Sequence, residues 1–291
     1  MHVGPTNSGK TYHAINRLKE AKTGIYCSPL RLLAHEIYTL MNNLGKPCEL
    51  ITGEDKRMPT VNGEIMETVI NDEGEIVTPM LSSTIEMSNF AREFEVAVID
   101  EIQMIQDSQR GWAWTNVLLG IKAREIHLCG EESSVPLVKK IFGSLHEKVI
   151  VKKYERLSKL QTSDQTLNAN WKNIKEGDCV VAFSRKKIFE IQKQVESVTG
   201  MKCAVIYGGL PPDNRSRQAN LFNDPTSEYK VLIASDAVGM GLNLKIRRTI
   251  FDSLKKFDGN TFKPLTTSQI KQIGGRAGRF NVGYDIGIIT T

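Results

Sequence analysis

Eight residues near the start of the chain, Gly4-Pro5-Thr6-Asn7-Ser8-Gly9-Lys10-Thr11, decide the fold class of its first part. They match the phosphate-binding loop pattern G-x-x-x-x-G-K-[ST]. The two glycines allow the backbone to curl so that its N–H groups point at bound phosphates. Lys10 can reach the β- and γ-phosphates, and the Thr11 hydroxyl can ligate Mg²⁺. We therefore expect all eight residues to line a nucleotide site that opens a helix over residues 10–22.

The position of this loop is unusual. Such a loop ordinarily follows a buried strand of about five or six residues. Only Met1, His2 and Val3 stand in front of it, and no signal or transit segment precedes it. We expect the first strand to be truncated and the chain to be the core of a longer protein.

Composition bounds the class of protein. The chain has 291 residues, is 40% hydrophobic and 24% charged, and carries a formal net charge of +5. This length suits two domains with separate cores. No apolar run reaches the ~18 residues of a membrane span, so we expect no membrane contact. The mild positive charge is compatible with a polyanion partner without establishing one.

The five cysteines form no C-x-x-C pair. Most of them lie in apolar runs, so we expect buried free thiols in a reducing compartment and no zinc site. They are Cys27, Cys48, Cys129, Cys179 and Cys203.

Short apolar runs alternate with helical spacing along the chain, which predicts parallel sheets covered by helices. Two such sets are separated near residues 154–160, and residues 53–80 are polar and predict a loop or hairpin insertion. The expected helices are 30–45 and 185–200, and the expected strands are 23–29, 95–100, 125–130, 147–155, 178–184, 202–209, 229–235, 247–253 and 284–290.

A second motif follows the predicted strand at 95–100. Asp100 and Glu101 stand at its carboxyl end, where ligands bind in α/β sheets. Asp100 would hold Mg²⁺, and Glu101 could orient and deprotonate an attacking water. The pair and the loop together predict nucleoside triphosphate binding.

Two classes of enzyme share this much sequence. Type-II thymidine kinases carry a similar loop and a D-E-x-Q-F motif, but they usually hold a zinc site built on C-x-x-C pairs and have one domain. The other class is the nucleic-acid motors. The stretch from Gln272 to Arg279 favours these, because Arg276 and Arg279 stand three apart, on one face of a helix, and could stabilise charge on a γ-phosphate.

Nine stretches together resemble the DExH-type RNA helicases of superfamily 2, most closely the mitochondrial, degradosome-associated branch in its fungal form. They occur in the family's order and cover essentially the whole chain. They are GPTNSGKTYHAI, SPLRLLAHEIY, STIEM, VAVIDEIQMIQDSQRGWAWTNVLLG, HLCGE, CVVAFSRKKI, AVIYGGLPP, ASDAVGMGLNL and TTSQIKQIGGRAGRF.

The resemblance implies two RecA-like domains, residues 1–155 and 156–291, with ATP and Mg²⁺ in the cleft between them and helical accessory domains absent. It implies RNA-stimulated ATP hydrolysis, single-stranded or 3′-tailed RNA as substrate, a 3′ exoribonuclease as partner, and the mitochondrial matrix as location. An RNA-binding relative without unwinding activity is a further alternative, although its catalytic motifs are intact.

The resemblance also assigns site residues. Gln103 completes the D-E-x-Q box, Asp236 and Gly239 face the nucleotide, and Gln272 joins Arg276 and Arg279 in the last motif. The residues implied to contact RNA are Pro29, Arg31, Thr84, Glu86, Ser184, Arg185 and Gly241. Trp112 and Trp114 are expected in the core rather than stacked on bases.

Overall fold

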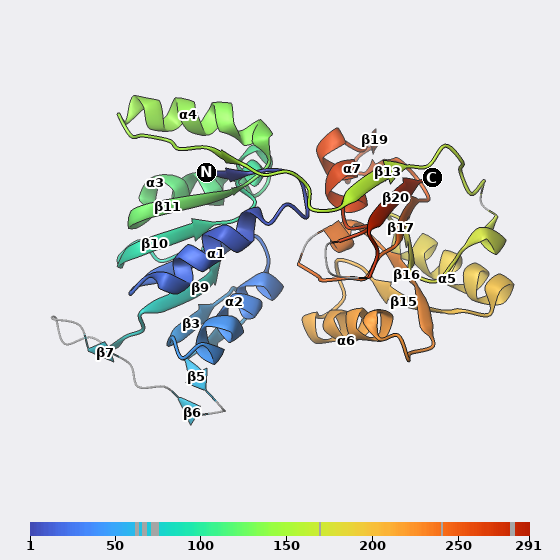
Figure 1. Cartoon of the computed structure of the whole chain (residues 1–291), viewed down its shortest axis with the longest axis horizontal. Helices are drawn as coiled ribbons and strands as arrows, with labels where there is room; N and C mark the ends of the chain where they lie inside the picture. Colours follow the sequence, from blue (N-terminus) through green and yellow to red (C-terminus); the bar gives the residue numbers. More distant parts are fainter. Residues whose placement is uncertain (62–63, 66–68, 71–75, 169, 240, 280–282) are drawn as a thin grey trace. The chain divides into compact units, whose positions relative to one another are not determined.

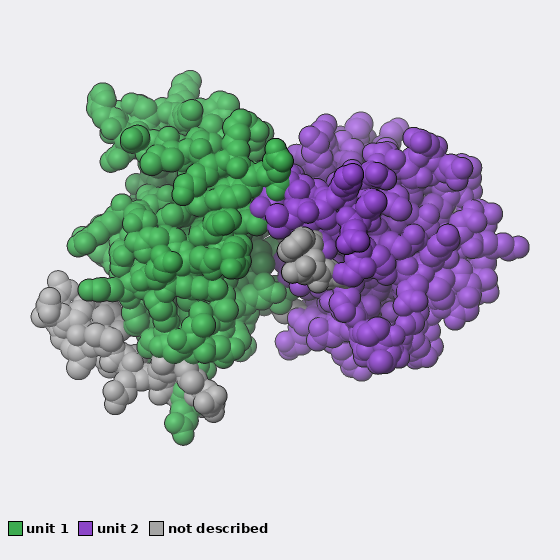
Figure 2. All heavy atoms as spheres, in the orientation of Figure 1, with its two compact units in different colours: residues 1–4, 9–155 green, residues 5–8, 156–291 purple. Residues whose placement is uncertain are grey.

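The computed structural model describes residues 1–61, 64–65, 69–70, 76–168, 170–239, 241–279 and 283–291. The chain divides into two compact units (Figure 2). The first comprises Met1–Gly4 and Gly9–Glu155, and the second comprises Pro5–Ser8 and Arg156–Thr291. The functional domain limits given above remain a prediction.

The first unit is built on an eight-stranded sheet in which every neighbouring pair is parallel except β3 and β4 (Figure 1). Two central strands, β2 (Gly24–Ser28) and β9 (Met80–Thr84), are buried along their whole length, as is typical of parallel strands covered on both faces. Their order is β12 (Lys152–Lys153), β1 (His2–Val3), β11 (Lys122–Gly130), β10 (Glu93–Ile99), β2 (Gly24–Ser28), β9 (Met80–Thr84), β3 (Cys48–Ile51) and β4 (Lys56–Arg57).

Two pairs of helices cover this sheet. Helices α1 (Lys10–Glu20) and α2 (Arg31–Asn43) pack on one face, against strand residues such as Tyr26. Helices α3 (Gly111–Gly120) and α4 (Val135–Ser144) pack on the other face, where the fully buried Trp114 lies. Each strand thus contributes alternate side chains to two cores.

The second unit has a six-stranded, all-parallel sheet of its own. Helix α5 (Arg185–Thr199) buries its apolar stripe against this sheet. Helix α6 (Pro212–Asn223) packs on β15 and β16, and α7 (Thr267–Gly274) lies against β17. The strand order is β13 (Lys159–Thr162), β20 (Ile286–Thr290), β17 (Arg248–Phe251), β14 (Asp178–Val181), β16 (Tyr229–Ala234) and β15 (Lys202–Ile206).

Short elements complete both units. The 3₁₀ helices η1 (Ile85–Met87), η2 (Ile102–Gln106) and η3 (Glu132–Ser134) follow strands of the first sheet, and η4 (Trp171–Asn173) and η5 (Asp236–Gly239) belong to the second unit. An antiparallel hairpin of β18 (Lys255–Phe257) and β19 (Phe262–Pro264) follows β17. No helix in the described part of the chain is long and apolar enough to cross a membrane.

The predicted alternation of buried strands and helices is confirmed, with some omissions. The expected strand over residues 147–155 is wrong in extent, because only the exposed β12 forms there. The predicted insertion contains the hairpins β5 (Thr60–Val61) with β6 (Glu64–Ile65) and β7 (Val69–Ile70) with β8 (Ile76–Val77) among its described residues. Strand β9 escaped prediction because its second half is polar, although Ser82 and Ser83 are fully buried. The Ser82 hydroxyl is satisfied by donating to the Ala34 carbonyl at 2.7 Å.

Two further expectations have clear outcomes. All five cysteines are buried and free, as predicted. Trp114 is fully buried, but the expectation for Trp112 is wrong, because 57% of it is exposed. Both residues stand on α3, and only one of two positions two apart on a helix can face the core.

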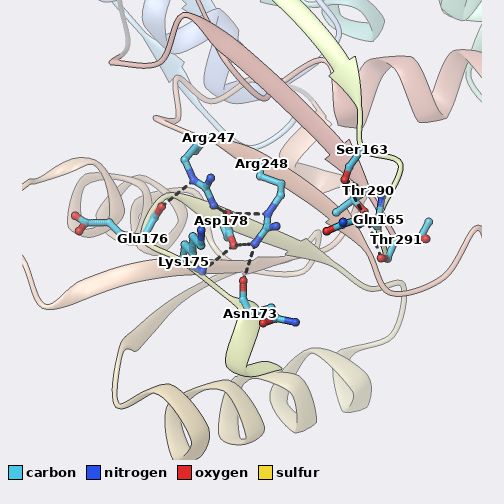
Figure 3. A network of polar contacts seen from close by, with 10 residues as sticks. All are labelled: Ser163, Gln165, Asn173, Lys175, Glu176, Asp178, Arg247, Arg248, Thr290 and Thr291. Atoms are coloured by element: carbon cyan, nitrogen blue, oxygen red, sulfur yellow. Dashed lines mark hydrogen bonds and ion pairs between the residues drawn. The ribbon is translucent and has the colours of Figure 1, made fainter. Parts of the chain in front are cut away.

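A buried carboxylate organises the amino end of the second sheet (Figure 3). The Asp178 side chain is inaccessible to solvent and accepts hydrogen bonds from Arg247 at 2.6 Å and from Arg248. The Lys175 backbone N–H donates to the same carboxylate at 2.8 Å. Arg248 also donates to the Asn173 carbonyl at 2.9 Å, so the group ties η4 to two strands.

We predict that Asp178→Asn destabilises the second unit by about 3 kcal/mol, because removing one member of a buried charge group leaves the other uncompensated. Denaturant-dependent hydrogen exchange of the β14 amides would measure this. Glu228→Gln is the matched control, since the Glu228 side chain is 62% exposed in its ion pair with Lys202. Equal losses in both variants would contradict the prediction.

Candidate functional site

The phosphate loop has the backbone that its chemistry requires. Gly9 has φ 77° and is the residue before α1, and Asn7 has φ 60°. Lys10 is buried, and the buried Ser8 hydroxyl has no hydrogen-bond partner among the described residues. An unsatisfied buried hydroxyl beside a helix N-terminus fits an incoming phosphate oxygen. Gly4 and Gly9–Thr11 belong to the first unit, whereas Pro5–Ser8 are grouped with the second.

Asp100 lies at the end of β10, beside the first turn of α1. Its carboxylate accepts from the Thr11 hydroxyl at 3.2 Å and from the Tyr26 hydroxyl at 2.8 Å. Burial, followed by the neighbouring Glu101 carboxylate, raises the pKa of Asp100 to about 6. A carboxylate and a hydroxyl in contact are oxygen ligands of the kind that Mg²⁺ prefers. The residues present therefore fit the metal that the motif implies.

Glu101 has a left-handed backbone, with φ 52° and ψ 49°. This conformation is uncommon outside glycine and is retained where the surroundings fix it. The Glu101 N–H donates to the Asp100 carboxylate at 2.9 Å, and the Gln103 amide donates to the Glu101 carboxylate. The Glu131 N–H in turn donates to Gln103 Oε1 at 3.1 Å. The D-E-x-Q box is thus a closed hydrogen-bonded turn.

Gly130 is a site-shaping residue that sequence reasoning missed. A Cβ atom there would stand 2.4 Å from Gln103 Oε1 and 2.7 Å from the Ile102 side chain. The glycine lets Gln103 lie against the end of β11. The signal was present in the stretch HLCGE, which resembles the family but had no assigned role.

Four residues predicted to contact RNA line one cavity of about 400 Å³ in the first unit. They come from the last residue of β9 and from the segments that follow β2 and β9, since the carboxyl ends of neighbouring parallel strands meet at one edge of the sheet. The full lining is Pro29, Leu30, Arg31, Gly53, Thr84, Glu86, Met87 and Arg110.

Arg110 is one of four lining residues that the sequence did not single out. Its Nε donates to the Glu86 carboxylate at 2.8 Å, and its Nη2 donates to the Pro29 carbonyl at 2.9 Å. It therefore holds together the segments after β2 and β9. Its only signal was its place in the long stretch that resembles the family.

The remaining predicted contacts of the second unit lie in different settings. Ser184 is the N-cap of α5, where its hydroxyl accepts from the Lys187 N–H at 3.2 Å. The Arg185 guanidinium lies 4.9 Å from the centre of the Tyr207 ring. Asp236 forms an ion pair with Lys256. The structure gives these side chains partners of their own and does not gather them into one cluster.

The arginines of the last motif converge, although not in the predicted way. Helix α7 ends at Gly274, so the expectation that Arg276 and Arg279 share a helical face is wrong. They lie in the following turn, where Gly278 has φ 58°. Both donate to the Leu242 carbonyl, at 3.3 and 3.1 Å, and Arg276 Nε donates to the Gly239 carbonyl at 2.9 Å.

Two other predicted residues belong to this part of the second unit. The Gln272 amide nitrogen is buried without a hydrogen-bond partner among the described residues. Gly239 is buried beside Ile273 and Gln272, because a Cβ atom there would stand 3.3 Å from Ile273 Cγ1 and 3.8 Å from Gln272 Cγ. Gly241 has φ 73°, a conformation that suits glycine.

Arg156, which was not among the predicted site residues, donates hydrogen bonds to this turn. Arg156 donates to the Gly275 carbonyl at 2.8 Å and to the Ala277 carbonyl at 2.6 Å, on either side of Arg276. The Ser158 hydroxyl donates to the Gly278 carbonyl. Burial, followed by the charge of Arg279, lowers the pKa of Arg156. Because these bonds go to backbone carbonyls, no sequence pattern reports them.

Two protein families match the chain. The family described as "DEXQ-box helicase domain of Suv3" matches residues 1–154, and the family described as "Helicase conserved C-terminal domain" matches residues 153–281.

Curated relatives match over nearly the whole chain. The mitochondrial DExH-box ATP-dependent RNA helicase DExH18 of Arabidopsis thaliana is 50% identical over 291 residues, which are 100% of this chain and 35% of the relative. The mitochondrial ATP-dependent RNA helicase SUPV3L1 of Homo sapiens is 48% identical over 100% of this chain and 36% of its own length. SUV3 of Saccharomyces cerevisiae is 48% identical over 96% of this chain and 36% of its own length. The chain thus spans about a third of these relatives.

Solved structures show the same architecture at low identity. S. cerevisiae Dbp5 bound to RNA and ADP BeF3 has a TM-score of 0.62 and 13% sequence identity, and the match covers 99% of this chain and 78% of Dbp5. At this identity the likeness concerns the fold alone. The predicted fold class, tandem RecA-like units of mainly parallel sheets covered by helices, is confirmed.

We predict that Arg156→Lys loosens the turn over residues 275–279. Lysine keeps the charge but lacks the planar fork that reaches two carbonyls at once. Losing one such bond, worth about 1 kcal/mol, would speed hydrogen exchange of these amides roughly five- to tenfold. Lys159→Ala, at an exposed position of β13, is the control and should leave their exchange unchanged. Unchanged protection in Arg156→Lys would show that the Arg156 hydrogen bonds do not stabilise this turn.

Proposed function

This chain belongs to the Suv3 family of ATP-dependent RNA helicases, and on that premise we propose that it is a helicase core that couples ATP hydrolysis to movement on RNA or its unwinding. The observation that carries the proposal is the contact of the Thr11 hydroxyl with the buried Asp100 carboxylate at 3.2 Å. These two oxygens follow a phosphate loop and fit the Mg²⁺ of a bound nucleotide.

Each residue of the first site has a proposed part in hydrolysis. The loop N–H groups and Lys10 hold the phosphates of ATP, and Thr11 and Asp100 hold Mg²⁺. When bound, Mg²⁺ neutralises charge on the phosphate oxygens. Glu101 accepts the proton of the attacking water, and the hydrogen bond from Gln103 keeps its carboxylate in place.

Residues of the second unit have proposed roles as well. Arg276 and Arg279 would stabilise the charge that develops on the γ-phosphoryl group, as guanidinium groups do in related phosphoryl transfer. The Gln272 amide nitrogen, which has no hydrogen-bond partner among the residues that the structure describes, is proposed to bind a nucleotide oxygen or water. Asp236 and Gly239 are proposed to contact the nucleotide.

RNA is the proposed polymer substrate, and single-stranded or 3′-tailed RNA is the proposed form. The cavity lined by Pro29, Arg31, Thr84 and Glu86 would receive its backbone. Ser184, Arg185 and Gly241 are proposed to contact it from the second unit. Contacts of this kind go mainly to phosphate and sugar, which suits a protein that moves over any sequence.

Location and partner follow from the family. The relatives named above are mitochondrial, and the same location is proposed for this chain. Delivery of RNA to a 3′ exoribonuclease rests on the family resemblance alone. The nucleoside-kinase alternative has no place for residues 153–281, which match a helicase domain.

We expect the chain to release phosphate from ATP faster with single-stranded RNA than without it. In Glu101→Gln, turnover should fall at least ~10²-fold while Mg²⁺-dependent ATP binding persists, because the variant loses the water-activating base and keeps the ligands of the metal. Steady-state phosphate release and equilibrium binding of a fluorescent ATP analogue would measure the two quantities.

Glu132→Gln is the control for this experiment, since Glu132 is an exposed acid of the same unit that pairs with Lys153. Its turnover should match wild type. Wild-type turnover in Glu101→Gln would exclude Glu101 as the base, and phosphate release that ignores RNA would contradict the helicase proposal.

A further inference from the structure

A buried tryptophan contacts the turn that carries the two acids. Trp114 Nε1 donates a hydrogen bond of 2.9 Å to the backbone carbonyl oxygen of Asp100. This carbonyl belongs to the peptide group that joins Asp100 to Glu101. Trp114 is fully buried on α3, so this donor is held by the surrounding core. Glu101 takes its left-handed conformation at the next residue. The position of the indole therefore bears on the backbone strain of the proposed base.

One arginine joins this tryptophan to the predicted RNA cavity. The Arg110 guanidinium carbon lies 5.3 Å from the centre of the Trp114 ring, which is within cation–π range. The same guanidinium donates to Glu86 and to the Pro29 carbonyl, both of which line the cavity. A single planar group thus contacts the indole on one side and two RNA-facing loops on the other.

The ion pair between Arg110 and Glu86 can respond to an anion that enters the cavity. The Arg110 side chain is 37% exposed and the Glu86 side chain is 30% exposed, so the pair is open to solvent at the cavity. A phosphate that enters the cavity competes with the Glu86 carboxylate for the guanidinium, and it is repelled by Glu86 itself. Occupancy of the cavity and the position of Arg110 are therefore linked.

We propose that Arg110 and Trp114 are positioning residues that report RNA in this cavity to the Asp100–Glu101 turn, and so carry part of the RNA stimulation of ATP hydrolysis. The inference rests on the function proposed above. An RNA phosphate draws Arg110 away from Glu86 and from the face of the indole, which the core holds in place. Without the cation over its ring, the indole N–H is a weaker donor to the Asp100 carbonyl, and the backbone at Glu101 is less constrained. Neither residue touches the reacting atoms.

Two variants separate this coupling from RNA affinity. Arg110→Lys keeps the positive charge but cannot span Glu86, the Pro29 carbonyl and the indole at once. Trp114→Phe keeps an aromatic ring and removes the N–H that reaches Asp100. The exposed Trp112, on the same helix, supplies the control Trp112→Phe.

The measurement is phosphate release by this chain across a titration of unstructured single-stranded RNA. In Arg110→Lys we expect the ratio of RNA-saturated to RNA-free kcat to fall about tenfold, in the range typical of coupling between sites. The RNA concentration that gives half stimulation should change by less than about threefold, since the charge is kept. Trp114→Phe should likewise lower the kcat ratio and leave the RNA concentration at half stimulation nearly unchanged. Trp112→Phe should match wild type in both quantities. A purely structural loss would instead lower kcat equally with and without RNA.

The outcomes are distinguishable. If wild type responds to RNA and Arg110→Lys and Trp114→Phe respond equally well, the coupling inference is overturned and the helicase proposal stands. If Trp114→Phe does not fold, Arg110→Lys alone decides, because its side chain is partly exposed. If wild type shows no RNA stimulation, both the helicase proposal and this inference fail.

Discussion

The proposed nucleotide site of the first unit depends on one buried carboxylate, that of Asp100. Asp100 is placed at the carboxyl end of a central parallel strand, where burial raises its pKa to about 6 from 3.8. Between these pH values the folded chain binds a proton that the unfolded chain has released, so stability falls as the pH rises through this window. At neutral pH the ionised group costs folding free energy, and the Mg²⁺ proposed for this site would offset that cost when bound.

Hydrogen bonds from several elements connect this carboxylate to the rest of the unit. Tyr26 and Thr11 fix its side chain, and Trp114 fixes its carbonyl. The next residue, Glu101, is consequently held in a backbone conformation that it would not adopt alone. Arg110 extends the same set of contacts to the cavity proposed to receive RNA. The proposed nucleotide and RNA sites are thus joined by packed side chains within one unit.

Sequence reasoning could predict what depends on local pattern. The phosphate loop, the acids after β10 and the alternation of buried strands with helices follow from spacing and composition. It could not predict contacts that depend on tertiary packing: the polar strand β9, the turn that holds Arg276 and Arg279, and the backbone bonds of Arg156. Arg110 shows the reason most clearly, because its partners Glu86 and Pro29 come from two distant segments and no spacing in the chain indicates them.

The central proposal is that ATP and RNA bind to two coupled sites of this chain. The most direct test measures the affinity of the wild-type chain for single-stranded RNA with and without Mg²⁺ and a non-hydrolysable ATP analogue, and the affinity for the analogue with and without RNA. We expect each ligand to tighten binding of the other by the same factor, roughly 5- to 150-fold. Affinities that do not depend on the other ligand would contradict it.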